Sequence, residues 1–338
     1  MIFVYQCQKR QEFWGIMSSL DLKDRKILYQ LDLNCRQSNT QIGKKVGLKR
    51  EVVAYRIKNL QETGVIRNFY ADINTFKLGY NVFRVYINFQ YVTPDIKNEI
   101  IQYFTDYPDS WVVATSKSEI DLVIVIWVKD ILEFYQFWDK TLDKYEEYFS
   151  EYTICIYIQA FVYKKSYLLK EQKDPNREMF RFSCGGKPTE IDELENSLLN
   201  ELAINGRASL IELSDKFGCS SQTIKYRIKN LVKSGVINAF RVNLNLLKLN
   251  LHRYKANIYL KDHKFKKPIF DYLKDKPYLE YMNLALGWAD LEPEIIVKNV
   301  DELLKILDEI NSKFPNAIKK QSFFITEKVY KLRCMPEL

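Results

Sequence analysis

The residues best suited to bind another molecule lie on two predicted helices with matching letters. Residues 55–60 (YRIKNL) recur unchanged at 226–231, an offset of 171 positions. Apolar side chains at 53, 57 and 60 mark the buried face of the first helix, so its basic side chains point outward. Such side chains reach base edges near the beginning of a helix and phosphates farther along it. This chemistry predicts binding to double-stranded DNA. The predicted DNA-binding residues are Ser38, Lys49, Arg50, Glu51, Tyr55, Arg56 and Lys58, and in the second copy Ser209, Ser220, Ser221, Gln222, Thr223, Lys225, Tyr226, Arg227 and Lys229.

The charge of the chain supports this prediction. The 338 residues include 51 Lys and Arg against 43 Asp and Glu, a formal net charge of +8. Residues 36–70 hold eight basic and two acidic side chains, and residues 207–241 hold seven basic and two acidic ones. These two segments together carry +11, and the rest of the chain carries −3. Positive charge is thus concentrated on the predicted helices, as contact with a phosphate backbone requires.

Few side chains are suited to catalysis or metal binding. The chain has two histidines, His252 and His263, and six scattered cysteines without a CxxC pair. This pattern is typical of reduced thiols in a cytoplasmic protein and argues against a disulfide framework or a zinc site. We therefore expect no enzyme activity, no catalytic residues, no metal and no cofactor. The sequence shows no signal peptide and no apolar run long enough to span a membrane, so no membrane partner is expected.

Three helical patterns open each half of the chain and position the DNA-binding residues. In the first half, helices are predicted from Asp21, over 38–47 and over 49–63. Ser38 is a natural N-cap, and the glycines after the second and third helices fit the left-handed conformation that ends a helix. Alternation over 65–73 then predicts a strand, as in a wing. Two short helices joined by a tight turn indicate a helix-turn-helix, and the second half repeats this plan.

The remainder of each half is predicted to be an α+β domain of the ferredoxin-like type. The order βαββαβ is that of the split βαβ unit. Residues 82–160 hold 13 acidic and six basic side chains, which makes this domain an unsuitable surface for nucleic acid. In the first half, strands are expected at 82–91, 111–115, 122–128 and 153–163, with helices at 95–107 and 131–145. In the second half, strands are expected at 254–260, 281–286, 294–297 and 321–329, with helices at 267–274 and 300–313.

The repeat divides the chain into two halves of similar plan. Matches at the constant offset continue without a gap over more than 50 residues, and a two-residue deletion in the second copy is expected between about 80 and 115. The expected fold is α+β, with two winged helix-turn-helix domains and two ferredoxin-like domains arranged as an intrachain pseudo-dimer. The predicted domains are an N-terminal extension (1–16), a first winged helix-turn-helix (17–75), a first effector domain (76–168), a linker (169–188), a second winged helix-turn-helix (189–246) and a second effector domain (247–338).

The first helix-turn-helix resembles the DNA-binding domain of the Lrp/AsnC, or feast/famine, transcriptional regulators. The resemblance rests on a pattern spread over nearly 50 residues, namely Leu20, Asp21, Asp24, Arg25, Asn34, Arg36, Ser38, Ile42, Val46, Gly47, Leu48, Arg56, Ile57, Leu60, Gly64, Val65 and Ile66. The second copy keeps Asp192, Asn205, Gly206, Arg207, Ser209, Arg227, Ile228, Leu231, Gly235, Val236 and Ile237. The resemblance implies a cytoplasmic transcriptional regulator that forms homo-oligomers. It also implies that the two sheets pack face to face within one chain and place two recognition helices on one DNA site.

The same resemblance implies an effector pocket, for which an amino acid is the expected ligand. In the family this pocket lies near a Gly-x-x-Asp turn between the second and third strands of the effector domain. The second half matches this turn with Gly287 and Asp290, whereas the first half has Ser118 and Asp121. The first half therefore lacks the glycine that would let a ligand approach the backbone. An alternative is that Asp121 and Asp290 only cap tight turns.

Two other functions are compatible with this architecture. Fused siroheme decarboxylases resemble tandem Lrp-like chains of this length, and they need His and Arg around a tetrapyrrole pocket. The first half has no histidine, and only the pair His252 and Arg253 falls near the relevant strand of the second half. A third hypothesis is a protein-interaction scaffold whose DNA-binding units have decayed. Against the scaffold, the repeat is best preserved on the third helix of each unit.

Overall fold

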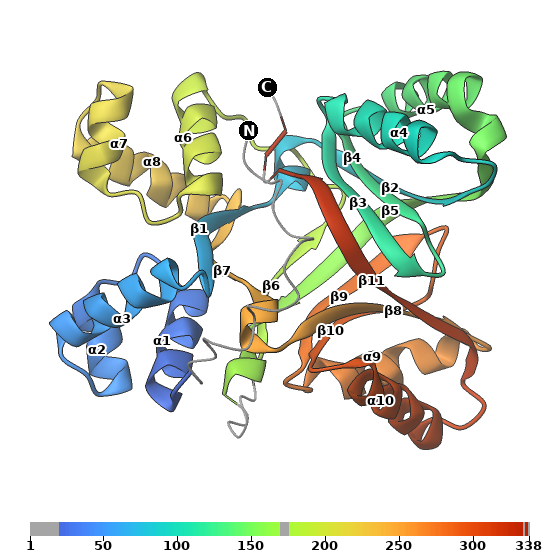
Figure 1. The fold of residues 1–338 in the computed structure, drawn as a ribbon. Coiled ribbons are helices and arrows are strands. Elements are labelled where there is room, and N and C mark those ends of the chain that lie inside the picture. The colour runs from blue at the N-terminus through green and yellow to red at the C-terminus, as the bar shows by residue number, and fades with distance from the viewer. Residues whose placement is uncertain (1–19, 170–175, 334, 337–338) are drawn as a thin grey trace.

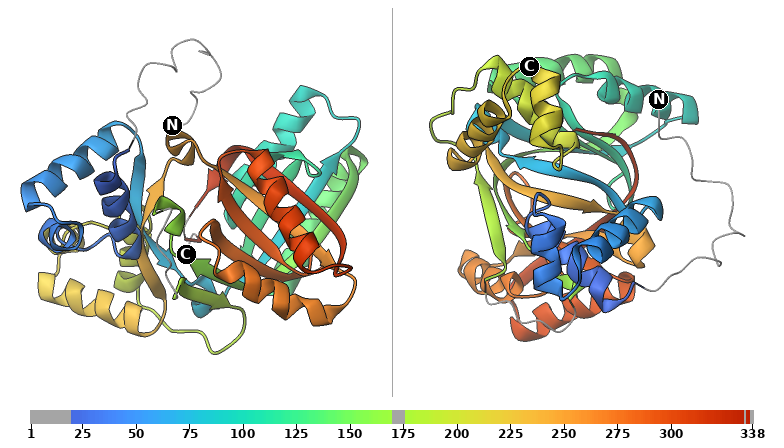
Figure 2. Two further views of the ribbon diagram at one scale, coloured as in Figure 1. Left: turned by 90° about the horizontal axis from the view of Figure 1, so that it is seen from below. Right: turned by 90° about the vertical axis from the view of Figure 1, so that its left-hand side faces the viewer.

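The computed structural model of the protein describes residues 20–169, 176–333 and 335–336, so the extension predicted at 1–16 lies outside the described residues. Two helix-turn-helix units lie on one side of the molecule, and a β-barrel with its helices lies on the other (Figures 1 and 2). Among the described helices, none combines the length and apolar character that crossing a bilayer requires.

Each helix-turn-helix unit has three helices followed by a strand, as the repeat predicts. The first unit comprises α1 (Leu22–Leu33), α2 (Asn39–Val46), α3 (Arg50–Glu62) and β1 (Ile66–Ile73), and the second comprises α6 (Glu193–Ile204), α7 (Leu210–Phe217), α8 (Ser221–Lys233) and β7 (Ile237–Leu244). Ser38 begins α2 with a capping box, in which its side chain accepts from the backbone of Gln41 and the Gln41 side chain accepts in return. Gly47 ends α2 with a positive φ of 68°, the conformation that glycine adopts most easily.

The strands β1 and β7 do not form free wings but pair with each other between the two units. Tyr70 lies opposite Arg241, and these two positions are equivalent in the repeat, so a pseudo-twofold axis passes between them. The backbone N–H of Cys35, after α1, donates to the carbonyl of Phe240 in β7 at 2.8 Å. The backbone N–H of Gly206, after α6, makes the equivalent bond to Phe69 in β1, also at 2.8 Å. Each unit therefore packs its first helix against the strand of the other.

This exchange of strands gives both units one continuous apolar core. The core includes Leu28 and Leu31 from α1, Leu198 and Leu202 from α6, and the inward side chains of both strands. The approach is close, because a Cβ at Gly206 would lie 2.7 Å from the backbone carbonyl carbon of Tyr70. Neither unit buries its apolar face without the other.

The two effector domains follow the predicted βαββαβ order. The first has β2 (Asn81–Phe89), α4 (Pro94–Asp106), β3 (Ser110–Ser118), β4 (Leu122–Val128), α5 (Ile131–Tyr145) and β5 (Phe149–Tyr163). The second has β8 (His252–Leu260), α9 (Lys266–Lys274), β9 (Leu279–Leu286), β10 (Glu292–Val297), α10 (Val300–Lys313) and β11 (Ile318–Leu332). Short 3₁₀ helices lie between these elements: η1 (Thr75–Leu78), η2 (Glu146–Tyr148), η3 (Ser166–Leu168), η4 (Leu246–Leu249) and η5 (His263–Phe265).

The eight effector strands close into one barrel. Their order is β2-β4-β3-β11-β8-β10-β9-β5, and β5 pairs again with β2. The two sheets face each other across the interior, as expected, and their edges are in addition hydrogen-bonded at β3–β11 and β5–β9. Each of these eight strands therefore has a hydrogen-bonded neighbour on both sides. Helices α4 and α5 cover one side of the barrel, and α9 and α10 cover another (Figure 1).

Part of the predicted linker is structured. Residues 178–183 form β6 (Glu178–Ser183), which extends the sheet beside β5. The prolines and glycines around this segment predicted a linker without regular structure, and alternating Phe180 and Phe182 were the overlooked strand signal.

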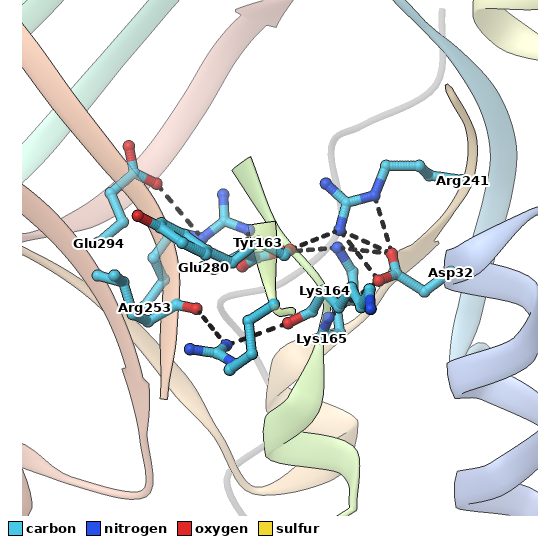
Figure 3. Close-up of polar contacts among 10 residues, drawn as sticks. Asp32, Tyr163, Lys164, Lys165, Arg241, Arg253, Glu280 and Glu294 are labelled. Atoms are coloured by element: carbon cyan, nitrogen blue, oxygen red, sulfur yellow. Dashed lines mark hydrogen bonds and ion pairs between the residues drawn. The ribbon is translucent and has the colours of Figure 1, made fainter. Parts of the chain in front are cut away.

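A chain of six charges, four of them buried, joins the helix-turn-helix pair to the barrel (Figure 3). Arg241 at the pseudo-twofold axis bonds Asp32 of α1, with Nε to Oδ1 at 2.9 Å and Nη2 to Oδ2 at 3.1 Å. The Nζ of Lys165 lies 3.3 Å from Asp32 Oδ1 and 2.5 Å from Oε1 of Glu280 in β9. Glu280 also accepts from Arg253 Nη2 at 2.7 Å. Arg253 then lies 3.7 Å from Glu294, so the signs alternate along the chain.

This network holds Glu280 ionised although its carboxylate is buried. Asp32, Arg241 and Glu280 are fully buried, and Lys165 is 4% exposed. Burial alone would raise the pKa of Glu280, but Arg253 and Lys165 outweigh it and hold the pKa below its usual value. Because such a charge is costly without its partner, removing one member should be more harmful than removing an exposed ion pair.

We expect Asp32→Asn to lower the free energy of unfolding by about 3–5 kcal/mol, because Arg241 and Lys165 would lose their shared carboxylate in a buried site. The control is Glu327→Gln, which removes the partner of Lys117 in an exposed pair at 3.0 Å and should cost less than about 1 kcal/mol. Urea unfolding followed by circular dichroism measures both. Equal losses in the two variants would contradict a structural role for the buried network.

Candidate functional site

The outward faces of α3 and α8 carry most of the predicted DNA-binding side chains. On α3, Lys49, Arg50, Tyr55 and Lys58 are exposed, and Tyr55 is 71% exposed. The exposed set on α8 includes the equivalent Tyr226, at 61%. The exposed predicted residues of α8 and its N-cap are Ser220, Gln222, Lys225, Tyr226 and Lys229.

Arg56 and Arg227, both predicted to bind DNA, are instead held by carboxylates of their own unit. Arg56 Nη1 lies 2.7 Å from Asp21 and 2.8 Å from Asp24, and these bonds raise the pKa of the guanidinium. Arg227 makes the equivalent pairs with Asp192 at 2.7 Å and Glu195 at 3.2 Å. Both arginines therefore join the third helix of their unit to the first.

Three further arginines counted as positive surface also serve inside the protein. Arg241 belongs to the buried network. Arg36 donates to the carbonyls of Gly206 and Ala208 at 3.0 and 2.9 Å, and its guanidinium lies over Phe240. Arg207 lies over the ring of Phe69 in the same way. The exposed positive charge of these units comes mainly from their lysines, Arg50 and Arg67, and Lys58 among them lies 3.7 Å from Glu62.

The predicted hydroxyl residues divide between capping and exposed positions. Ser38 and Ser209 both form capping boxes, so their hydroxyls accept from the backbones of α2 and α7. Ser220 caps α8 and bonds Thr223. The Ser221 hydroxyl lies 3.1 Å from that of Ser214 and donates to the carbonyl of Leu210 at 3.3 Å. A hydroxyl that accepts from a backbone N–H in a cap still has its own O–H to donate, so capping is compatible with a contact to a phosphate oxygen.

The two recognition helices differ most where they begin. Lys49, Arg50 and Glu51 of the first unit correspond to Ser220, Ser221 and Gln222 of the second. Base edges are read by side chains at this end of a recognition helix. The two units therefore present different chemistry to a DNA groove, with charged groups on one and neutral groups on the other.

The predicted effector residues lie at the two seams that close the barrel. Ser118 is at the β3–β11 seam, where its hydroxyl donates to the carbonyl of Phe323 at 2.7 Å. Gly287 follows β9, next to the β5–β9 seam, and a Cβ there would lie 2.7 Å from the carbonyl oxygen of Ile154. Both residues have positive φ, 112° for Ser118 and 86° for Gly287. Packing against β5 thus accounts for the glycine.

The two aspartates of these turns make the same bond in both halves. Asp121 accepts from the backbone N–H of Phe89 at 2.9 Å, and Asp290 accepts from that of Leu260 at 2.8 Å. These bonds join the end of one strand to the turn before another, which is the capping role that the sequence left open. Amino-acid binding at Ser118, Asp121, Gly287 and Asp290 stays a prediction.

A cavity of about 440 Å³ lies between the β1–β7 ribbon and the open end of the barrel. Its walls include Arg84 of β2 and Lys255 of β8, which share Glu292 at 2.6 and 2.7 Å. Burial works against these charges, but Glu292 outweighs it and raises the pKa of Arg84. Neither His252 nor His263 lines this cavity. No imidazole is therefore available in this cavity to act as a general acid.

Comparisons with known proteins agree with the geometry of the units. A family described as winged helix-turn-helix DNA-binding matches residues 20–67 and 191–238. The transcriptional regulator Ptr1 of Methanocaldococcus jannaschii is 34% identical over 112 residues, which cover 33% of this chain and 74% of that protein. The chain belongs to the Lrp/AsnC family of transcriptional regulators. LrpA of Pyrococcus horikoshii is 30% identical over 111 residues, which cover 33% of this chain and 77% of that regulator.

The helix-turn-helix family matches the chain at two sites, which confirms the predicted tandem duplication. A third of this Lrp/AsnC chain covers about three quarters of each relative, and the helix-turn-helix match occurs twice. Over nearly its full length, the chain is similar in fold to the siroheme decarboxylase NirDL, with a TM-score of 0.62. The alignment covers 92% of this chain and 93% of NirDL at 11% identity, so it shows a shared fold only. The named relatives are regulators, which supports the prediction of a chain that is not an enzyme.

Asp72 of β1 lines the cavity, and its ionisation makes the free energy of unfolding of the protein depend on pH. Burial raises its pKa to about 6. Arg241, Lys165 and Asn238 oppose the rise, and Asp32 adds to it. In the unfolded chain an aspartate titrates near pH 4. Between about pH 4 and 6 the folded protein therefore binds a proton that the unfolded chain has released, and stability falls as the pH rises.

We expect Asp72→Asn to match the wild type in stability near pH 4 and to exceed it by up to about 3 kcal/mol above pH 6, because the variant loses no proton. Urea unfolding across this pH range measures the difference. Asp139→Asn, on the exposed face of α5, is the control and should follow the wild-type curve. An Asp72→Asn curve parallel to the wild type would contradict this assignment.

Proposed function

We propose that the protein is a transcriptional regulator in which α3 and α8 of one chain bind a single double-stranded DNA site. The observation that carries this proposal is the equivalent exposed set on the two helices, Tyr55 with Tyr226 and Lys58 with Lys229. Both units lie on the side of the molecule away from the barrel (Figure 1). A regulator that binds DNA works where the genome is, so we place it in the cytoplasm.

The proposed interface combines phosphate contacts and base contacts. Lys58 and Lys229, on the middle of their helices, contact phosphates. Arg50 and Gln222, at the beginning of theirs, contact base edges, for which arginine favours guanine and glutamine favours adenine. Arg56 and Arg227 support this surface by holding each third helix on its first helix. Because the two sets differ, the site bound is asymmetric.

We also propose that the chains associate further into homo-oligomers. The face of α5 that points away from the barrel exposes Ile131, Leu132 and Tyr135 at 58–64%. Equivalent positions on α10 include Val300 and Leu304, which are 37% and 44% exposed. Adjacent exposed apolar side chains on a helix favour a protein contact.

The alternative of a siroheme decarboxylase has support only from the fold shared with NirDL. The histidine expected of such an enzyme is missing from the central cavity, because the chain has two histidines and neither lines it. Purified protein with a tetrapyrrole absorption band and no affinity for DNA would support the enzyme.

Replacing Lys58 or Lys229 by Ala should weaken DNA binding on all sequences alike and reduce the slope of log affinity against log salt by about one each. The reason is the loss of one phosphate contact per lysine. Fluorescence anisotropy with labelled duplexes at several salt concentrations measures this. Lys140→Ala, an exposed lysine of α5, should leave the slope unchanged. Unchanged slopes in both test variants would favour the decayed scaffold.

DNA selected from a random pool should show two unlike half-sites. A variant with Lys, Arg and Glu in place of Ser220, Ser221 and Gln222 gives α8 the first turn of α3. This variant should select sites closer to a palindrome, because both helices would then offer the same groups to the bases. Sequencing of the selected DNA gives the result. Perfect palindromes from the wild type would refute the asymmetric site.

A further inference from the structure

We propose that the cavity between the β1–β7 ribbon and the barrel binds a flat aromatic molecule that carries one carboxylate. The cavity is separate from the seam residues Ser118 and Gly287, neither of which lines it. Its volume of about 440 Å³ lies in the range of small-molecule sites. Its shape and chemistry come from the way in which the two halves have diverged.

The carboxylate is indicated by buried donors that have no acceptor. Among the described residues, Arg84 Nε, Tyr86 OH and Trp127 Nε1 are buried without a hydrogen-bond partner, and all three residues line the cavity and are 1% exposed. An unsatisfied buried donor costs about 1–3 kcal/mol. A ligand with acceptor oxygens would satisfy several of them at once.

Where Arg84 and Lys255 line the cavity, the local charge favours an anion over a neutral acceptor. Arg84 and Lys255 share one carboxylate, that of Glu292, so the three groups carry a net charge of +1. Lys255 Nζ has three donors, and Glu292 accepts from only one. The Arg84 guanidinium lies 4.8 and 4.6 Å from the ring centroids of Tyr86 and Tyr157, which fixes its position beside Lys255. A carboxylate between these two cations would neutralise the cluster.

The aromatic body is indicated by the wall that the first half contributes. Three pairs of equivalent positions line the cavity, apolar in the first half and charged in the second: Val82 with Arg253, Trp111 with Glu280, and Val125 with Glu294. Trp111 stacks on Trp127 with ring centroids 5.3 Å apart and planes at 6°. A third flat ring can continue such a stack. The charged wall belongs to the chain of six charges described above, in which three cations balance three carboxylates.

Isothermal titration calorimetry with three indoles tests the proposal: indole-3-propionate, its uncharged amide, and tryptamine. We expect indole-3-propionate to bind once per chain, the amide at least tenfold more weakly, and tryptamine more weakly still. Lys255→Met should weaken the binding of indole-3-propionate at least tenfold. It should also remove the preference of the protein for the acid over the amide. Lys117→Met, an exposed lysine of β3, should change nothing.

A second variant, which fills the cavity, tests the proposal independently in case Lys255→Met does not fold. Ala114 of β3 lines the cavity, and Ala114→Phe adds a ring there without removing a charge. This variant should keep its thermal unfolding transition and lose indole-3-propionate binding. Full binding by Ala114→Phe, equal affinities for the acid and its amide, stronger binding of tryptamine, or no binding of indole-3-propionate at about 1 mM would each overturn the proposal.

Discussion

The pairing of β1 with β7 is the constraint on which the rest of the structure depends. Each third helix leads directly into one of these strands, and each strand completes the core beneath the first helix of the other unit. The distance between the recognition helices is therefore fixed by the ribbon and not by a flexible connection. The same ribbon covers the open end of the barrel, so any change in the cavity acts on the frame that holds α3 and α8.

Arg241 shows why this arrangement suits a duplicated chain. A residue at a twofold axis faces its own copy in a symmetric dimer, and two buried arginines there would repel. Here Arg241 faces Tyr70, and its partner Asp32 corresponds to Ala203 in the other half. The Arg241–Asp32 ion pair therefore occurs once, on one side of the pseudo-twofold axis, and has no counterpart on the other side. Pairing of two second halves would bury two arginines without Asp32, so the network favours pairing within a chain.

Much of the fold was predictable from local signals. N-caps such as Ser38, stops such as Gly47, and the unbroken offset of 171 residues located the helices and the repeat. The exchange of strands, the barrel closure and the contact between Asp32 and Arg241 were not predictable, because they join residues far apart in sequence and leave no periodic pattern. The role of Arg56 was missed although a signal existed. Asp21 and Arg56 recur together as Asp192 and Arg227, which is expected of residues that bond each other.

Comparison of the two halves shows that residues needed for the barrel fold are unchanged, whereas residues that line the cavity differ. Asp121 and Asp290 have stayed identical and make the same bond to the strand before them, because the barrel needs that bond twice. Positions that face the interior have changed in chemical class, as Trp111 and Glu280 show. A symmetric dimer cannot do this, since every substitution would appear on both walls at once. Duplication removes that restriction, and one wall can become apolar while the opposite wall becomes charged. The interior of this barrel is asymmetric because its two walls are encoded separately.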